Sequence, residues 1–138
     1  MCLFDIWPIC PCLGVKKMKT VIFFGHGARD ARWKEPFDRL IKLWEAKYPN
    51  TIASLAFLEM MSPTLPECIG SLQEQGLLEI QIIPVFFGQG GHLRKDFPVI
   101  LEECRRLYPK VQLSTSSAVG ESDDVLLSII EFTAQSIL

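Results

Sequence analysis

Two kinds of periodicity alternate four times along the chain, and this alternation constrains the fold more than any other feature. Short apolar runs rich in β-branched and aromatic residues predict buried strands, because such side chains pack well on a pleated surface. After each run, apolar residues recur every three to four positions, which is the spacing of an amphipathic helix. Four strand–helix units in succession predict an α/β domain with a four-stranded parallel sheet, helices on both faces and right-handed crossovers.

The expected elements fill most of the chain. Strands are predicted at Lys19–Phe24, Thr51–Leu58, Leu78–Phe87 and Val111–Ser116. Helices are predicted at Phe37–Tyr48, from a Ser62 cap with Pro63 in the first position to Gly76, at Leu93–Tyr108, and after a Ser122 cap. In the last helix the residues expected to face the core are Val125, Leu126, Ile129 and Phe132. Pro84 is awkward in the third strand, because proline has no N–H to donate to the ladder.

The first 17 residues differ from the rest of the chain. They hold three of the five cysteines, and acidic and proline residues interrupt their apolar stretch, unlike a secretory signal. We interpret Met1–Lys17 as an extension, either disordered or translated from upstream of a true start at Met18, and residues 18–138 as a single domain. Cys10-Pro11-Cys12 is compatible with metal binding or a disulfide, but a lone C-x-C is weak evidence, because a zinc site normally needs four ligands at set spacings.

Composition excludes several classes of partner. The net charge of −2 over 138 residues produces no global basic field for nucleic acid. Charges or prolines interrupt every apolar run before it is long enough to cross a bilayer, so no membrane association is expected. Cys68 and Cys104 fall at apolar helix positions, which predicts buried free thiols and a cytoplasmic location.

Three side chains with metal-binding chemistry follow the first three predicted strands. His26, Glu59 and His92 are separated by equal intervals (59 − 26 = 33 and 92 − 59 = 33), about one strand–helix unit each. Because ligands bind beyond the carboxyl ends of parallel strands, the three are expected at one edge of the sheet. Two imidazoles and a carboxylate suit iron, cobalt, nickel or zinc, and three protein ligands leave coordination positions open for catalysis.

Glycines surround both histidines. Gly25 and Gly27 flank the first, and such residues allow positive φ and close approach of the backbone to a ligand. The second follows the run Gly88, Gln89, Gly90 and Gly91, which leads into a helix. That run is also compatible with phosphate binding at a helix N-terminus, although it lacks the dinucleotide and Walker patterns.

Basic residues lie near the same two strand exits: Arg29, Arg32 and Lys34 near the first, Arg94 and Lys95 near the second. Solvation of helix surfaces explains them, and so does attraction of a substrate with several carboxylates. Four apolar residues nearby are candidates for lining a slot for a flat ring: Met60, Met61, Phe86 and Phe87. Core packing is at least as good an explanation for the two phenylalanines.

Three blocks, Val21–Arg29, Ala56–Glu59 and Pro84–Pro98, resemble the short-form sirohydrochlorin chelatases of the class II chelatase family. The resemblance runs from about Met18 to the C-terminus. Its most specific part is His92-Leu-Arg-Lys-Asp followed two residues later by Pro98. One departure is Ala28 after the Gly-His-Gly, where serine is frequent.

The resemblance implies a chelatase-like (flavodoxin-like) three-layer sandwich that works as a homodimer. It implies that a divalent metal, Co²⁺, Fe²⁺ or Ni²⁺, is inserted into the tetrapyrrole sirohydrochlorin in cobalamin- or sirohaem-type biosynthesis without an organic cofactor. His26 and His92 match the catalytic and metal-binding histidines, and Glu59 matches the carboxylate that joins them as a metal ligand. Substrate binding is expected at Arg29, Gly88, Gln89, Gly90, Gly91, Arg94 and Lys95.

Metal insertion requires the loss of two pyrrole protons, and a neutral imidazole can accept one of them. Metal and proton then compete for the same histidine, so the order of steps is open. Two other functions use the same residues. One is a metal or tetrapyrrole carrier without turnover. The other is a metal-dependent hydrolase, which would need a further acid or base near the metal.

Overall fold

A computed structural model describes residues 20–88 and 90–138. Four parallel strands form one sheet in the order β2-β1-β3-β4. The strands are β1 (Thr20–Gly25), β2 (Ala53–Phe57), β3 (Glu79–Pro84) and β4 (Gln112–Thr115). The extension and the start at Met18 lie outside the described residues, as do Gln89 and the side chain of His92.

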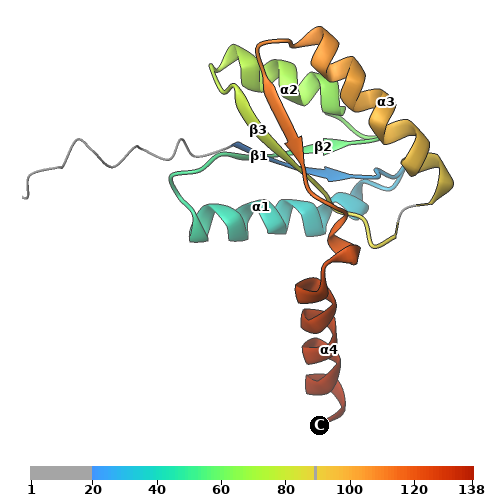
Figure 1. Ribbon diagram of the computed structural model, residues 1–138. Coiled ribbons are helices and arrows are strands. Elements are labelled where there is room, and N and C mark those ends of the chain that lie inside the picture. Colours follow the sequence, from blue (N-terminus) through green and yellow to red (C-terminus); the bar gives the residue numbers. More distant parts are fainter. Residues whose placement is uncertain (1–19, 89) are drawn as a thin grey trace, which may run out of the picture.

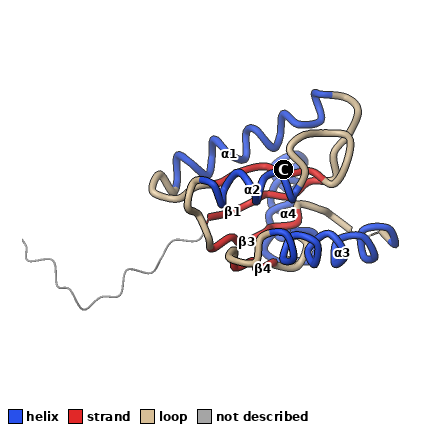
Figure 2. The backbone as a smooth tube through the Cα atoms, turned by 90° about the horizontal axis from the view of Figure 1, so that it is seen from above, coloured by secondary structure: helices blue, strands red, loops and turns tan. Residues whose placement is uncertain are grey.

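Helices cover the two faces of the sheet, as Figures 1 and 2 show. The helices are α1 (Glu35–Lys47), α2 (Leu65–Glu74), α3 (Gly91–Leu107) and α4 (Asp123–Ile137), with short 3₁₀ turns η1 (Ala31–Lys34) and η2 (Val119–Glu121). Helix α1 packs on one face, where Trp44 meets Phe23 edge to face. Helices α2 and α3 pack on the other face. The predicted α/β fold with a four-stranded parallel sheet is confirmed.

The core lies between β1, β3 and the pair α2/α3. Alternation along β1 directs Ile22 and Phe24 into it, and both side chains are fully buried. Phe97 of α3 stacks on Phe24 with ring centroids 5.3 Å apart. Cys68 and Cys104 are buried free thiols, as expected, and burial raises the pKa of each to about 11.

Helix α2 begins later than the Ser62 cap predicts. Thr64 is the N-cap, and it forms a capping box in which its side chain accepts from the Glu67 N–H and the Glu67 carboxylate accepts from the Thr64 N–H. The preceding residue is tied to the sheet, because the Phe57 N–H donates to the Pro63 carbonyl. This pairing holds Ser62 and Pro63 outside the helix.

Strand β3 ends at Pro84, three residues before the predicted Phe87. Its last position tolerates the missing N–H of proline, and the next residue resumes the pairing, since the Val85 N–H donates to the Phe24 carbonyl at 2.8 Å. The awkward proline therefore marks the end of the strand.

Helix α4 contradicts the expectation for its apolar residues. It begins after Ser122, as predicted, although the serine side chain makes no capping bond. The helix buries none of its residues and projects away from the sheet (Figure 1). Ile129 is 43% exposed and Phe132 is 71% exposed, so neither faces the core. Across the described part of the chain, every helix is too short or too polar to cross a bilayer.

Candidate metal-binding edge

The loops after β1 and β2 run side by side at the carboxyl edge of the sheet. These strands are neighbours, and their pairing continues past their ends: the Leu58 N–H donates to the Gly25 carbonyl, and the Glu59 N–H donates to the His26 carbonyl at 3.1 Å. Backbone hydrogen bonds thus fix His26 and Glu59 opposite each other before any side-chain contact forms.

The two side chains meet at this edge. His26 Nε2 lies 3.1 Å from Glu59 Oε1, and both side chains are about half exposed (51% and 50%). The imidazole and the Phe86 ring lie nearly perpendicular to each other, with ring centroids 6.4 Å apart. The pair is therefore oriented by the fold and still open to a ligand from solvent.

Gly27 makes the close approach of the two loops possible. Its φ of +93° suits glycine, and a Cβ there would lie 1.8 Å from the Glu59 carbonyl oxygen. Gly25 is also constrained, since the Phe37 ring lies 2.7 Å from where its Cβ would be. Both glycines around the first histidine are thus required by packing, one of them also by backbone conformation.

A cavity of about 540 Å³ adjoins the pair. Its walls come from two sides: His26, Leu58 and Glu59 on the strand exits, and Asp96, Val99 and Ile100 on α3. Buried Leu93 and the stacked Phe97 anchor this part of α3 to the core. The cavity is open to solvent and bordered by carboxylate, imidazole and aliphatic groups.

His92 occupies the first turn of α3. Residues four apart on a helix share a face, so position 92 lies on the face that carries Asp96, Val99 and Ile100. Among the side chains that the structure describes, no third His, Cys, Asp or Glu joins His26 and Glu59 to complete a metal site. The role predicted for His92 stays a prediction.

Sequence reasoning missed Asp96 as a site residue. Asp96 belongs to a helix, whereas the pattern that predicts the site contains only residues that follow strands. Its place in the cavity wall, four residues after His92, is the signal that could have identified it.

The glycines before α3 differ from those around His26. Gly88, Gly90 and Gly91 are exposed, and a Cβ on any of them would meet no atom within 4 Å in the described structure. Local packing therefore does not explain them. Gly90 is the N-cap of α3.

Two of the five predicted basic residues form ion pairs with neighbouring carboxylates. Arg32 Nη2 lies 2.7 Å from Asp30 Oδ2, and the hydrogen bonds from Arg32 lower the pKa of the Asp30 carboxyl group. Lys34 Nζ lies 3.5 Å from Asp38 Oδ1. Arg29, Arg94 and Lys95 are exposed.

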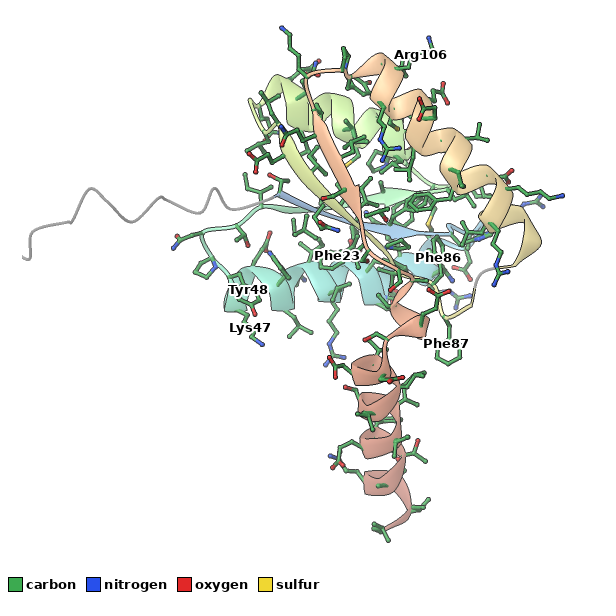
Figure 3. The ribbon with its side chains drawn as sticks, in the orientation of Figure 1. Phe23, Lys47, Tyr48, Phe86, Phe87 and Arg106 are labelled. Atoms are coloured by element: carbon green, nitrogen blue, oxygen red, sulfur yellow. The ribbon has the colours of Figure 1, made fainter. Side chains whose placement is uncertain are left out.

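The apolar residues predicted to line a slot for a flat ring differ in their exposure to solvent. Phe86 is buried in the core, whereas Phe87 is 69% exposed (Figure 3). Met60 is 58% exposed beside the site loop, with a φ of 61°.

Comparison with known proteins agrees with this architecture. The crystal structure of a CbiX protein from Marinobacter aquaeolei superposes with a TM-score of 0.75 at 27% identity, covering 87% of this chain and 98% of that one. A sirohydrochlorin cobaltochelatase from Methanococcus aeolicus is 31% identical over 61% of this chain and 59% of its own. A sirohydrochlorin ferrochelatase from Priestia megaterium is 27% identical over 85% of this chain and 44% of its own.

The chain spans about half the length of these curated relatives. The sequence model of one family, CbiX, matches residues 20–136 and so includes the whole described sheet and all four helices except the last residue of α4. With the match extending over most of its length, the chain belongs to the CbiX family.

Proposed function

We propose that this protein is a sirohydrochlorin chelatase that inserts Co²⁺ or Fe²⁺ into the tetrapyrrole. The observation that carries the proposal is the His26–Glu59 pair, held at the carboxyl edge of the sheet beside an open cavity. Membership in the CbiX family and relatives named cobaltochelatase and ferrochelatase support it. Ni²⁺ is a third candidate metal on ligand chemistry alone.

The spacing of the pair suits a shared metal ion. Two ligands that each lie ~2.1 Å from a metal, at angles of ~90–109°, are themselves ~3.0–3.4 Å apart. His26 Nε2 and Glu59 Oε1 are 3.1 Å apart, so both can bind one incoming ion without moving the backbone. His92 is the proposed third ligand, from the first turn of α3.

The same pair offers a route for a proton. With Nε2 protonated, His26 donates to the Glu59 carboxylate, and metal binding must displace that proton. With Nε2 free, the imidazole can accept a proton from a pyrrole nitrogen. His26 is therefore proposed to alternate between holding the metal and holding a proton, and Glu59 to stabilise the imidazolium.

The substrate is proposed to lie over the cavity. Arg29, in the loop after β1, and Arg94 and Lys95, in the first turns of α3, are exposed cations that are proposed to pair with substrate carboxylates. Gly88, Gln89, Gly90 and Gly91 would leave room for the flat ring next to the backbone. Residues 18–138 are proposed to form the functional unit, as a homodimer in the cytoplasm and without an organic cofactor.

A spectrophotometric insertion assay tests the proposal. Purified protein, at a tenth of the sirohydrochlorin concentration or less, is mixed with Co²⁺, Fe²⁺ or Ni²⁺ in turn. We expect absorption changes over many turnovers, faster than the spontaneous reaction, with wild-type protein. We expect none from His26→Ala or His92→Ala.

Stoichiometric binding without turnover would identify a carrier and overturn the enzymatic proposal. Full insertion activity of the His92→Ala variant would show that His92 is not required for metal insertion. Lys110→Ala, an exposed residue at the opposite end of the sheet from the site, is the matched control and should retain wild-type rates.

A further inference from the structure

The loop between β2 and α2 contains a tight turn at Met60, directly after Glu59. The Met61 N–H donates to the Glu59 carbonyl at 2.8 Å, which closes a turn of three residues. At the centre of this turn Met60 has a φ of 61°, and in the described part of the chain it is the only residue other than glycine with a positive φ. A three-residue turn of this kind is a γ-turn, and the form with positive φ at its centre is rare and strained.

Burial of the Met60 side chain does not compensate for this strain. The residue is 58% exposed to solvent. Its Cβ disfavours positive φ, whereas glycine would adopt the same φ without strain. Strained backbone persists only where the surrounding structure holds it, and it is frequent at functional sites. The contacts around the turn must therefore keep Met60 in this conformation.

Backbone hydrogen bonds fix the loop on both sides of the turn. Before the turn, the Glu59 N–H donates to the His26 carbonyl at 3.1 Å, which extends the pairing of β1 with β2. After the turn, the chain returns to the outer edge of β2, where the Phe57 N–H donates to the Pro63 carbonyl at 2.9 Å. The chain must therefore reverse direction between two fixed points, and the three-residue turn at Met60 achieves this over a very short length.

The turn also fixes the peptide group that follows Glu59. The carbonyl oxygen that accepts from Met61 lies over Gly27 of the first loop, so closely that a Cβ on that glycine would be 1.8 Å from it. This peptide is thus held by the turn on one side and by contact with Gly27 on the other. Its orientation sets the ψ angle of Glu59, and the side-chain rotamers open to a residue depend on its φ and ψ.

We propose that Met60 is a positioning residue, whose strained turn holds the Glu59 carboxylate in the rotamer that faces His26. Glu59 Oε1 lies 3.1 Å from His26 Nε2 although both side chains are about half exposed, so burial does not hold them together. In the proposed function, on which this role of Met60 rests, the pair binds the incoming metal. Affinity falls in proportion to the fraction of molecules in which the pair is correctly arranged.

Two substitutions at Met60 separate the effect of the backbone from that of the side chain. Met60→Gly and Met60→Val both remove the thioether, but glycine adopts positive φ freely and a β-branched residue resists it most. In calorimetric titration with Co²⁺, Met60→Gly should bind within about twofold of wild type, because its turn is kept. Met60→Val should bind about tenfold more weakly, the loss expected if the turn forms in about a tenth of the molecules.

A purely structural role would give a different result. Loss of stability alone would lower the urea midpoint of Met60→Val without changing the Co²⁺ affinity of the folded protein. Leu43→Val is the matched control, since it trims an apolar side chain that is 59% exposed on α1, and it should bind Co²⁺ as wild type does. Circular dichroism must show that Met60→Val is folded, and Met60→Thr, which is also β-branched, replaces it if it is not.

Amide hydrogen exchange reports on the turn without metal or substrate. The Met61 N–H is bonded to the Glu59 carbonyl only while the turn is formed. Its protection factor should fall at least about tenfold in Met60→Val and stay near the wild-type value in Met60→Gly, because exchange follows local opening.

The two measurements distinguish failure of this role from failure of the proposed function. Equal Co²⁺ affinities in Met60→Val and Met60→Gly would overturn the role of the turn: two unchanged affinities would show that it does not hold Glu59, and two weakened ones that the thioether acts instead. Equal Met61 protection in the two variants would also overturn it. If wild-type protein binds no Co²⁺ but Met61 protection follows the expected order, the proposed function fails and the turn still fixes the loop.

Discussion

The two glycine–histidine segments of the site have opposite structural character. Around His26, Gly27 lies under the Glu59 carbonyl at a φ of +93°, and backbone hydrogen bonds join the two loops. Before His92, the part of the chain that the structure describes leaves open space at the Cβ positions of Gly88, Gly90 and Gly91. In the first segment, close packing leaves no space for a side chain at the glycines. In the second segment, the described neighbouring atoms leave such space. Under the proposed function, we interpret the first segment as holding the proposed metal ligands in place and the second as leaving space for the substrate.

Of the substitutions considered, Gly27→Ala should lower the free energy of unfolding the most, because it disturbs the close packing of the loops that carry His26 and Glu59. Steric overlap with the Glu59 carbonyl and a φ that disfavours alanine should together cost about 3 kcal/mol or more of unfolding free energy. Urea unfolding measures this loss. Gly76→Ala is the control, because Gly76 has a φ of +79° but no atom within 4 Å of its Cβ position. It should cost only about 1 kcal/mol. Equal costs at the two glycines would show that overlap with Glu59 is unimportant.

Changes to the ligand pair should separate binding from stability. His26→Ala or Glu59→Gln should weaken Co²⁺ binding at least about 100-fold, the upper end of the effect of outer-shell partners of metal ligands. The unfolding free energy should change by only about 0.5 kcal/mol, because both side chains are half exposed. Calorimetric titration with Co²⁺ and urea unfolding of the same samples provide the two measurements. Unchanged Co²⁺ affinity in both variants would contradict a metal site at this edge.

Gly91→Ala tests the open segment. Alanine in the first turn of α3 should raise the unfolding free energy by up to about 1 kcal/mol, since glycine is the poorer helix former. Activity should nevertheless fall, because the new methyl group would occupy space proposed for the tetrapyrrole. Insertion rates at several sirohydrochlorin concentrations should show the loss in KM. A variant that is more stable but has unchanged insertion kinetics would contradict the proposal that the substrate binds next to this segment.

The sequence predicted the features that depend on local periodicity and chain topology. Equal intervals placed Glu59 opposite His26 because each interval is one strand–helix unit and because β1 and β2 are neighbours. The start of α2 was wrong by two residues, because Ser62 and Thr64 are both good caps. The pairing of Phe57 with Pro63, which is not a local feature, decides between them.

Helix α4 shows where such reasoning stops. Its periodicity correctly identified a helix after Ser122, but the pattern cannot say which surface covers the apolar side, or which molecule supplies that surface. Asp96 was missed for a related reason. Its position in the cavity depends on how α3 packs against β1 through Phe97, which is a tertiary contact.

Asp96 provides the smallest predicted effect and the finest test of the comparison. It is an exposed carboxylate of α3 that lines the same cavity as His26 and Glu59. Asp96→Asn removes a charge at nearly constant volume. Two unit charges about 4 Å apart interact by about 1 kcal/mol in water and by less when further apart, so Co²⁺ affinity should fall by at most about fivefold, with unfolding unchanged.

Salt dependence shows whether the effect of Asp96 acts through its charge. The difference between wild type and Asp96→Asn should shrink as ionic strength rises from 0.01 to 1 M, because the screening length falls from about 30 Å to about 3 Å. Glu103→Gln, an exposed carboxylate two turns further along α3, should change affinity less. A loss at Asp96 as large as that of Glu59→Gln, and insensitive to salt, would make Asp96 a metal ligand. The α3 side of the cavity would then be as much a part of the preset site as the β1–β2 edge.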